Sequence, residues 1–191
     1  MSAGSLLIFP ADPAASPPAL AALLGLLAES GLIGEPLPGR PGAYRVGHGF
    51  LRHVTFLGCS PHLVLDPPED GGDAFSHVAV LGPYDSPHLL VGDNTVAPRC
   101  RTCRAAFADW RAEALAWMSH PDATVATCPA CEARQAPAAL DWRETAAVGR
   151  VLVDVRNVFP GEGVPGDELL DRLASLSGGP WRYAWVHRRG R

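Results

Sequence analysis

The chain has 191 residues, of which 47% are hydrophobic, and its 16 basic and 20 acidic side chains give a formal net charge of -4. This length and apolar content predict one sizeable core with room for a small appended module. A net negative charge does not favour non-specific binding to nucleic acid. Every basic residue is an arginine. The absence of lysine excludes a P-loop lysine, a Schiff-base lysine and a lysine general base.

Membrane and export signals are missing from the residues given. No stretch approaches the roughly 20 apolar residues that a membrane span needs, and the longest apolar run, residues 19–28, is interrupted by Gly25. The first residues lack the basic region of a secretory signal and run directly into an apolar segment. We therefore expect a cytoplasmic protein with no membrane partner.

The N-terminal part predicts a strand followed by a helix. Residues 5–9 form a short apolar run that ends at Pro10, which is typical of a buried strand. After a turn-rich segment, Pro17 and Pro18 begin a helical pattern that ends near Gly31. Four leucines share one face of this predicted helix: Leu20, Leu23, Leu24 and Leu27.

Short strands are predicted through the middle of the chain. Each apolar run there is bounded by Gly, Pro or Asp. The runs are 43–46, 52–57, 62–65, 77–81 and 88–91. The Pro-rich segment 82–87 could join the last two as a hairpin.

The C-terminal part again predicts a strand, a helix and a strand. Residues 150–159 alternate in polarity and end at Pro160, which indicates a strand. Asp167 is a candidate N-cap for a leucine-rich helix that stops at Gly178. Residues 181–187 then predict a final strand with alternate residues on one side.

These elements predict an α+β fold, a mixed β-sheet with two packed helices. The two ends share the order strand, Phe-Pro, loop, Pro, helix, Gly and a strand containing a tyrosine, which is 43–46 at the first end and 181–187 at the second. This shared order suggests a degenerate β-α-β repeat. Because that order is common, and proline is frequent in this chain, chance explains it as well. The first part of the core would span 1–97, a four-cysteine insert 98–134, and the second part of the core 135–191.

The insert carries two Cys-x-x-Cys pairs separated by 24 residues, the spacing of a zinc-ribbon-like site for Zn²⁺. Four protein ligands leave no open coordination position, so the expected role of the metal is structural. A redox motif, a disulfide or an iron–sulfur cluster are the alternatives. The predicted ligands are Cys100, Cys103, Cys128 and Cys131.

Aromatic and basic residues accompany the cysteines. Residues 104–119 predict a helix whose aromatic stripe is a packing face rather than a ligand platform. The stripe consists of Phe107, Trp110, Ala114 and Trp117. The arginines near the ligands either offset the negative metal–thiolate centre or contact phosphate or an acidic partner. They are Arg99, Arg101, Arg104 and Arg134. The nucleic-acid alternative expects Arg99, Arg101, Arg104 and Arg111 to share one face.

The central strands contain the remaining candidates for chemistry. Cys59 and His62 could form a nucleophile–base pair or a second metal site, as in a small hydrolase. The alternative is that Cys59 is a small buried residue and that the histidines are polar residues at strand ends. The histidines of this region, for which the sequence assigns no role, are His48, His53, His62, His77 and His88.

Three segments carry a resemblance to a known group of proteins: 55–61, Asn94-Thr95 and 157–162. With the two Cys-x-x-Cys pairs, they resemble an uncharacterised family of bacterial proteins, some of which are labelled sugar ABC transporter ATPases. The resemblance covers most of the chain and implies a bacterial origin. The ATPase label conflicts with this sequence, because such an enzyme requires a P-loop lysine.

These observations favour a non-enzymatic, zinc-binding adaptor that contacts another protein. A small hydrolase that uses Cys59 and His62 is one alternative. Nucleic-acid binding through the arginine-flanked insert is the other, and it is disfavoured by the negative net charge.

Overall fold

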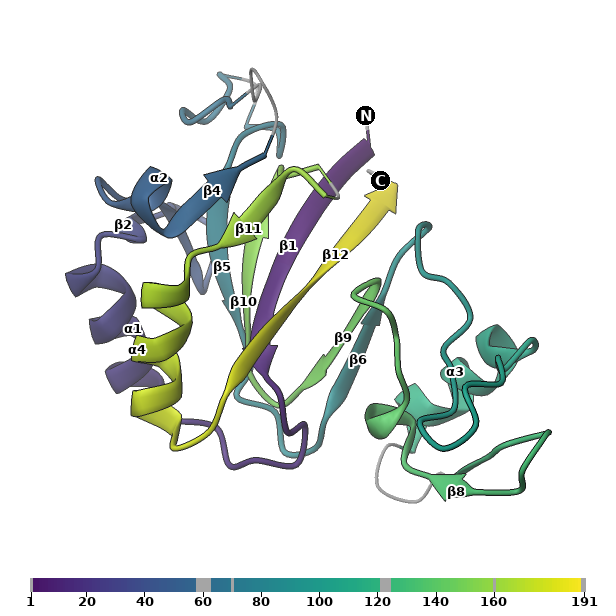
Figure 1. Cartoon of the computed structure of the whole chain (residues 1–191). Coiled ribbons are helices and arrows are strands. Elements are labelled where there is room, and N and C mark those ends of the chain that lie inside the picture. Colours follow the sequence, from purple (N-terminus) through teal and green to yellow (C-terminus); the bar gives the residue numbers. More distant parts are fainter. Residues whose placement is uncertain (1, 58–62, 70, 121–124, 160, 190–191) are drawn as a thin grey trace.

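A computed structural model describes residues 2–57, 63–69, 71–120, 125–159 and 161–189 (Figure 1). Its largest element is a six-stranded sheet with the order β12-β1-β10-β5-β3-β2. The strands are β1 (Ser2–Pro10), β2 (Ile33–Pro36), β3 (Ala43–Val46), β5 (His77–Leu81), β10 (Leu152–Arg156) and β12 (Trp181–Arg189).

Every pairing described in this sheet is antiparallel, where the sequence predicted a mixed sheet. The reason lies in the strand order. β10 and β12 both run antiparallel to β1, which lies between them, so they are parallel to one another without sharing hydrogen bonds. β1 and β2 are likewise parallel, and three strands separate them.

Two helices cover one face of the sheet, as predicted (Figure 1). They are α1 (Leu20–Glu29) and α4 (Asp167–Ser177). Leu23 and Leu27 of α1 and Leu169 and Leu173 of α4 are fully buried against alternate strand residues. Gly166 rather than Asp167 holds the N-cap position of α4, and Gly178 ends the helix in the left-handed conformation at φ 74°.

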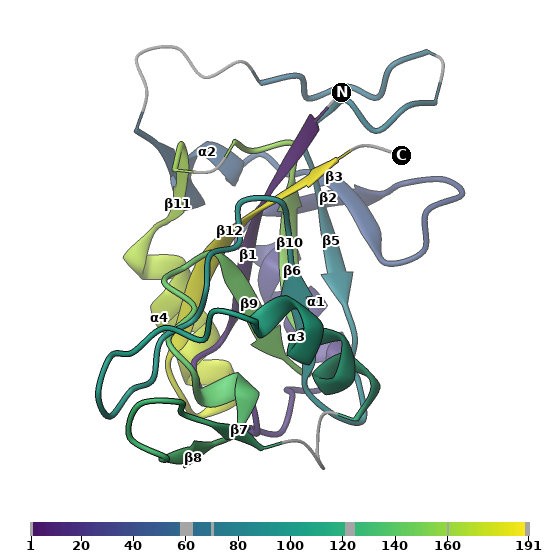
Figure 2. The same ribbon diagram turned by 90° about the vertical axis from the view of Figure 1, so that its right-hand side faces the viewer.

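The other face of the sheet is covered by a second layer. There β6 (His88–Val91) pairs antiparallel with β9 (Ala146–Gly149), and the cysteine-bearing insert lies beyond them (Figures 1 and 2). The predicted hairpin 82–87 is wrong, because β5 is hydrogen-bonded to β3 and β10 and β6 belongs to another sheet. The order of layers is therefore helices, six-stranded sheet, β6–β9 pair and insert.

The predicted strand 52–57 is only partly correct. A short helix, α2 (Phe50–His53), precedes β4 (Val54–Phe56), which pairs antiparallel with β11 (Gly163–Pro165). Of the predicted strand 62–65, residues 63–65 are not in a strand and His62 lies outside the described residues.

The insert and the segment directly after it hold the remaining elements. They are α3 (Trp110–Ser119), the antiparallel pair β7 (Ala126–Thr127) and β8 (Arg134–Gln135), and a 3-10 turn, Pro137–Ala139. The helix predicted over 104–119 is thus confirmed for 110–119, whereas residues 104–109 precede it outside any helix. Within the described part of the chain, no helix combines the length and the apolar character that crossing a bilayer requires.

Candidate metal centre

Two turns of matching local geometry carry the four cysteines. In the first, the Cys100 N–H donates to the Ala105 carbonyl at 2.9 Å and the Cys100 carbonyl accepts from Arg104 N–H at 2.9 Å. In the second, Cys128 has the equivalent bonds: its N–H donates to Ala133 at 2.9 Å and its carbonyl accepts from Glu132 N–H at 3.0 Å. Each turn therefore directs its two thiols to the same side.

A left-handed residue follows the second cysteine of each turn. Arg104 has φ 67° and Glu132 has φ 58°. A side chain at such a φ is unfavourable, so the surrounding hydrogen bonds must hold both residues in place. Because the two turns share this conformation, they face one another as near-equivalent halves of one site.

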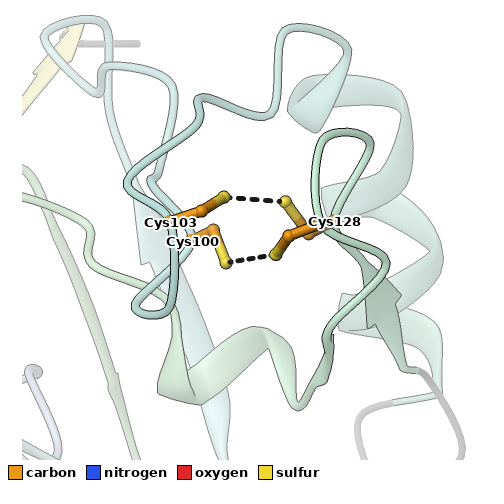
Figure 3. Close-up of side chains that lie close together, drawn as sticks. Cys100, Cys103 and Cys128 are labelled. Atoms are coloured by element: carbon orange, nitrogen blue, oxygen red, sulfur yellow. Dashed lines mark hydrogen bonds between the residues drawn. The ribbon is translucent and has the colours of Figure 1, made fainter.

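The sulfur atoms lie at distances suited to a tetrahedral metal site. A metal–sulfur bond of about 2.3 Å in a regular tetrahedron places the sulfurs about 3.8 Å apart. The Sγ atoms of Cys100 and Cys131 are 3.8 Å apart, and those of Cys103 and Cys128 are 3.5 Å apart (Figure 3). All four lie within 4.8 Å of one another. The four cysteines can therefore hold a metal ion.

The sulfur separations do not correspond to disulfides. A disulfide bond is about 2.05 Å long, whereas the sulfurs of Cys103 and Cys128, the closer of the two pairs, are 3.5 Å apart. All four cysteines are free thiols in the structure. Metal coordination, unlike a disulfide, uses all four in one centre.

Hydrogen bonds prepare Cys100 to act as a thiolate. The backbone N–H groups of Cys103 and Thr102 point at its sulfur and lower the pKa of the thiol to about 6, against the opposing effect of burial. Gln135 Nε2 also donates to this sulfur, at 2.9 Å. Backbone N–H groups of Ala130 and Cys131 lower the pKa of Cys128 in the same way.

Cys131 has the opposite tendency. The Ala133 N–H lowers the pKa of its thiol, but the sulfurs of Cys103, Cys128 and Cys100, together with burial, raise it to about 12. Crowded thiolates repel one another, so they cannot all ionise without a cation. A bound metal ion removes this conflict, because it attracts every thiolate.

A tryptophan cluster anchors the site to the rest of the protein. Trp142 is fully buried, and its ring meets those of Trp110 and Trp117 edge-on at 5.6 and 6.0 Å. Its Nε1 donates to the Pro137 carbonyl at 3.0 Å. The predicted packing role of the aromatic stripe is confirmed, since Phe107, Trp110, Ala114 and Trp117 are all buried.

The apolar cluster around the cysteines is wider than residues 98–134. It also includes Leu89 of β6, Val148 of β9, and Leu140 and Trp142 of the connection between the insert and β9. The insert is therefore packed directly onto the β6–β9 pair. The proposed boundaries 98–134 and their flanks, 1–97 and 135–191, stay predictions.

Several of the flanking arginines contact the protein itself. Arg104 forms an ion pair with Asp141 at 2.7 Å, and Arg101 Nε donates to the Ala139 carbonyl at 2.6 Å. Arg111 lies over the ring of Trp110 at 4.6 Å. The backbone of Arg99 bridges to Asp141, and that of Arg134 belongs to β8. The contacts described are with Asp141, the Ala139 carbonyl and the Trp110 ring, so the predicted offset of the thiolate charge stays a prediction.

The structure separates the central histidines. His53 is buried, and its Nε2 lies 2.9 Å from the Ser30 carbonyl oxygen. His77 is buried and stacks on Phe75, whereas His88 is exposed and stacks on Tyr84. The ring of His48 lies beside Gly31. None of these four histidines belongs to the group of described side chains that could hold a metal ion, which consists of the four cysteines. The pair Cys59 and His62 lies outside the described residues.

Three residues of functional interest were not predicted from sequence. Gln135 donates to a metal-site sulfur, Asp141 neutralises Arg104, and Asn94 hydrogen-bonds to β12. Asn94 was named only among the residues that carry the resemblance. None of the three follows a spacing rule, because each contact joins distant parts of the chain.

No protein-family model, no curated protein and no solved structure significantly matches this chain.

Proposed function

We propose that this protein is a non-enzymatic, zinc-binding adaptor in which a closed four-cysteine site holds a binding surface in place. The observation that carries the proposal is the meeting of four sulfurs from two matching turns within 4.8 Å. Zinc accepts four thiolates in a tetrahedron, and such a site leaves no position for water or substrate. The insert is zinc-ribbon-like in this proposal.

The proposal also includes a cytoplasmic location and a bacterial family. Free thiols in Cys-x-x-Cys pairs are typical of a reducing compartment, which favours the cytoplasm. The resemblance to uncharacterised bacterial proteins with two Cys-x-x-Cys pairs favours a bacterial origin. The proposal keeps a degenerate β-α-β repeat: β1, α1 and β2 at one end, and β10, α4 and β12 at the other, each run strand, helix and parallel strand. The strand 43–46, with which the first end was expected to close, is β3 and runs antiparallel to β1.

The outer face of α3 supports a binding role. Its inner residues pack on Trp142, but Leu115 and Met118 remain 68% and 51% exposed. Large apolar side chains placed three positions apart lie on the same helix face. Val125 adds a further exposed apolar side chain to the insert. Exposed apolar groups of this kind are common at protein–protein contact sites.

Metal analysis of the purified full-length chain tests the zinc site. We expect one zinc ion per chain, lost in the Cys100→Ser/Cys103→Ser variant. The matched control is Cys59→Ser, which removes the fifth cysteine and leaves both pairs intact. A chain purified without metal, or one that keeps stoichiometric zinc in the double variant, would contradict the proposal.

Capture of a specific partner tests the adaptor role. Wild type and the Cys100→Ser/Cys103→Ser variant are used to enrich proteins from a lysate of the native host, and the partner is then purified and titrated calorimetrically. We expect binding to the zinc-loaded wild type and loss of binding with Leu115→Ser/Met118→Ser, which keeps the metal ligands. Equal binding of the partner by wild type and by the Leu115→Ser/Met118→Ser variant would rule out this face of α3 as the contact site.

A further inference from the structure

β12 is an edge strand, and no strand of the described residues pairs with its outer side. It lies at the end of the six-stranded sheet, next to β1 (Figure 1). Consecutive residues of a strand direct their backbone N–H and C=O groups alternately to its two sides. The Trp185 N–H donates to the Glu144 carbonyl at 2.8 Å, away from β1. The odd-numbered residues of β12 therefore direct their backbone groups outward.

The second half of this outer edge is already covered. Asn94 Nδ2 donates to the Trp185 carbonyl at 2.9 Å, and Asn94 Oδ1 accepts from the His187 N–H at 2.7 Å. The Asp93 N–H donates to the His187 carbonyl at 2.8 Å. Loop residues thus take the place of a neighbouring strand from Trp185 onward.

The first half of the edge is open. The Tyr183 N–H and C=O face the same outer side as those of Trp185, and none of the residues that the structure describes hydrogen-bonds to them there. An open strand edge is a template for pairing with another chain. Here the open part is short, because Glu144 occupies the next position along the edge.

A cleft of about 600 Å³ lies along the open half. One wall is apolar and belongs to the helix-covered side: Leu170 of α4 with Trp181 and Tyr183 of β12. The other wall is charged and comes from Arg182 and the loop that follows the insert, through Asp141, Arg143 and Glu144. The cleft therefore has different chemistry on the two faces of β12.

Arg182 supplies the most distinctive group of the charged wall. Its guanidinium carbon lies 5.1 Å from the centre of the Phe9 ring, and burial lowers its pKa. No carboxylate of the described residues lies within ion-pair distance of it. Because Asp141 is paired with Arg104 at 2.7 Å, the wall offers two guanidinium groups, of Arg143 and Arg182, against the carboxylate of Glu144. This balance favours an anionic group.

We infer that this cleft binds an extended peptide segment of a partner protein, which adds a short strand to the open edge of β12 and presents an acidic side chain to Arg182. The inference rests on the proposed function, since it names the kind of segment that the adaptor takes. Main-chain hydrogen bonds to Tyr183 give such a peptide its register, and the two walls select its side chains.

The pleat of the added strand defines the sequence that fits. Side chains of a strand alternate between its two faces. A residue opposite Tyr183 meets the apolar wall, and its neighbour meets Arg182 on the charged wall. The motif is therefore apolar–acidic–apolar over three residues, the length that the open edge allows.

Nuclear magnetic resonance titration of the ¹⁵N-labelled, zinc-loaded full chain tests this inference. The probe is the end-blocked peptide Ser-Val-Glu-Val-Ser. It should shift the backbone amides of residues 181–183, and Arg182→Gln should weaken its binding about tenfold, the effect of losing one charge-assisted hydrogen bond. Arg182→Lys, which keeps the charge, should restore part of the affinity. The matched control, Arg172→Gln on α4, should bind the peptide like wild type.

Two altered peptides separate strand addition from simple charge attraction without changing the protein. Replacing the glutamate with glutamine should weaken binding to the extent that Arg182→Gln does. Methylating both valine nitrogens keeps the charge but removes the donors for the Tyr183 carbonyl, and should abolish binding. Equal binding by either altered peptide, or shifts that avoid residues 181–183, overturns the inference.

The result is separable from the fate of the proposed function. If the chain holds one zinc ion and captures a host protein through α3 while the peptide leaves β12 unchanged, only the inference fails. If the chain holds no zinc, or captures no partner at all, the proposed function itself fails.

Discussion

The core beneath α1 and α4 and the core around the cysteines differ in the structural elements and residue types that form them. The first takes alternate residues of paired strands and two leucine-rich helices. The second takes three tryptophans, short loops and two cysteine turns, and the strand pair described within the insert has two residues in each strand. Regular hydrogen bonding can hold the first together. In the second, side-chain contacts take the place of regular hydrogen bonding, and the proposed metal ion would add to them.

This difference has a consequence for stability. The helix-covered core buries most of its apolar groups whether or not a metal is bound. In the insert, by contrast, the two cysteine turns meet at the sulfurs and through Gln135, which donates to the Cys100 sulfur and accepts from the Arg101 N–H. The two regions should therefore respond differently to the same perturbation, and the expected effects can be ordered by size.

Removal of the metal should have the largest effect and should be confined to the insert. Structural zinc contributes about 10–16 kcal/mol to folding in small zinc-binding peptides. Chelation, or Cys128→Ser, should abolish the near-ultraviolet circular dichroism of the packed tryptophans. The amides of β1 and β10 should stay protected from hydrogen exchange. Unfolding of the whole chain in one step would show that the two regions are not independent.

A cavity in the helix-covered core should have the next largest effect. Leu169→Ala removes a fully buried side chain of α4 and should lower the free energy of unfolding by about 2–5 kcal/mol, measured by urea denaturation. Zinc content should not change. The matched control, Leu115→Ala on the exposed face of α3, should alter stability by less than about 0.5 kcal/mol.

Removing the Asn94 hydrogen bonds that tie the loop after β6 to β12 should have an intermediate effect on stability. Asn94→Ala removes the two hydrogen bonds to Trp185 and His187 at 2.9 and 2.7 Å. We expect a loss of about 1–3 kcal/mol in the free energy of unfolding, because backbone groups of β12 then lack partners. Asn94→Asp keeps the acceptor and should lose less. A neutral Asn94→Ala would show that water replaces the amide without cost.

The smallest expected effect is a pH dependence of stability that arises in the six-stranded sheet, at His77 of β5. Burial lowers the pKa of His77 below its ordinary value of 6.5. As the pH falls through 6.5, the unfolded chain takes up a proton that the folded chain resists, so unfolding becomes easier. Urea denaturation at about pH 7.5 and about pH 5.5, on either side of the ordinary histidine pKa, should show this loss in wild type. The loss should be smaller in His77→Phe, which keeps the ring stacked on Phe75. An identical pH dependence of the free energy of unfolding in wild type and His77→Phe would contradict this role of His77.

The same contrast explains which parts of the fold followed from sequence. The buried positions Leu23 and Leu27 of α1 and the alternation in β10 depend on local periodicity, and both were predicted. Leu20, expected on the same face of α1, is exposed. The pairing of β6 could not be predicted from its neighbours in sequence. β6 pairs with β9, which follows the whole insert in the chain, and not with β5 across residues 82–87. The antiparallel sheet likewise depends on β1 lying between β10 and β12, which no local pattern encodes.

At the metal site the cysteine spacing predicted the ligands but not their surroundings. Cys-x-x-Cys fixes two thiols in one turn, so the four candidate ligands could be named from sequence. Gln135 and Asn94 act through contacts across 35 and 91 positions of sequence. A single polar side chain in a loop carries no sequence signal for such a contact, and only the folded chain brings the partners together.

β1 is enclosed by other elements on every side. It has hydrogen-bonded neighbours along both edges, Leu6 and Ile8 pack under the helices, and Leu7 and Phe9 pack under the β6–β9 layer. Partial opening of one layer therefore leaves its backbone hydrogen bonds intact. Its amides should exchange with water only when the entire molecule unfolds, so that their exchange rate reports the global stability of the protein.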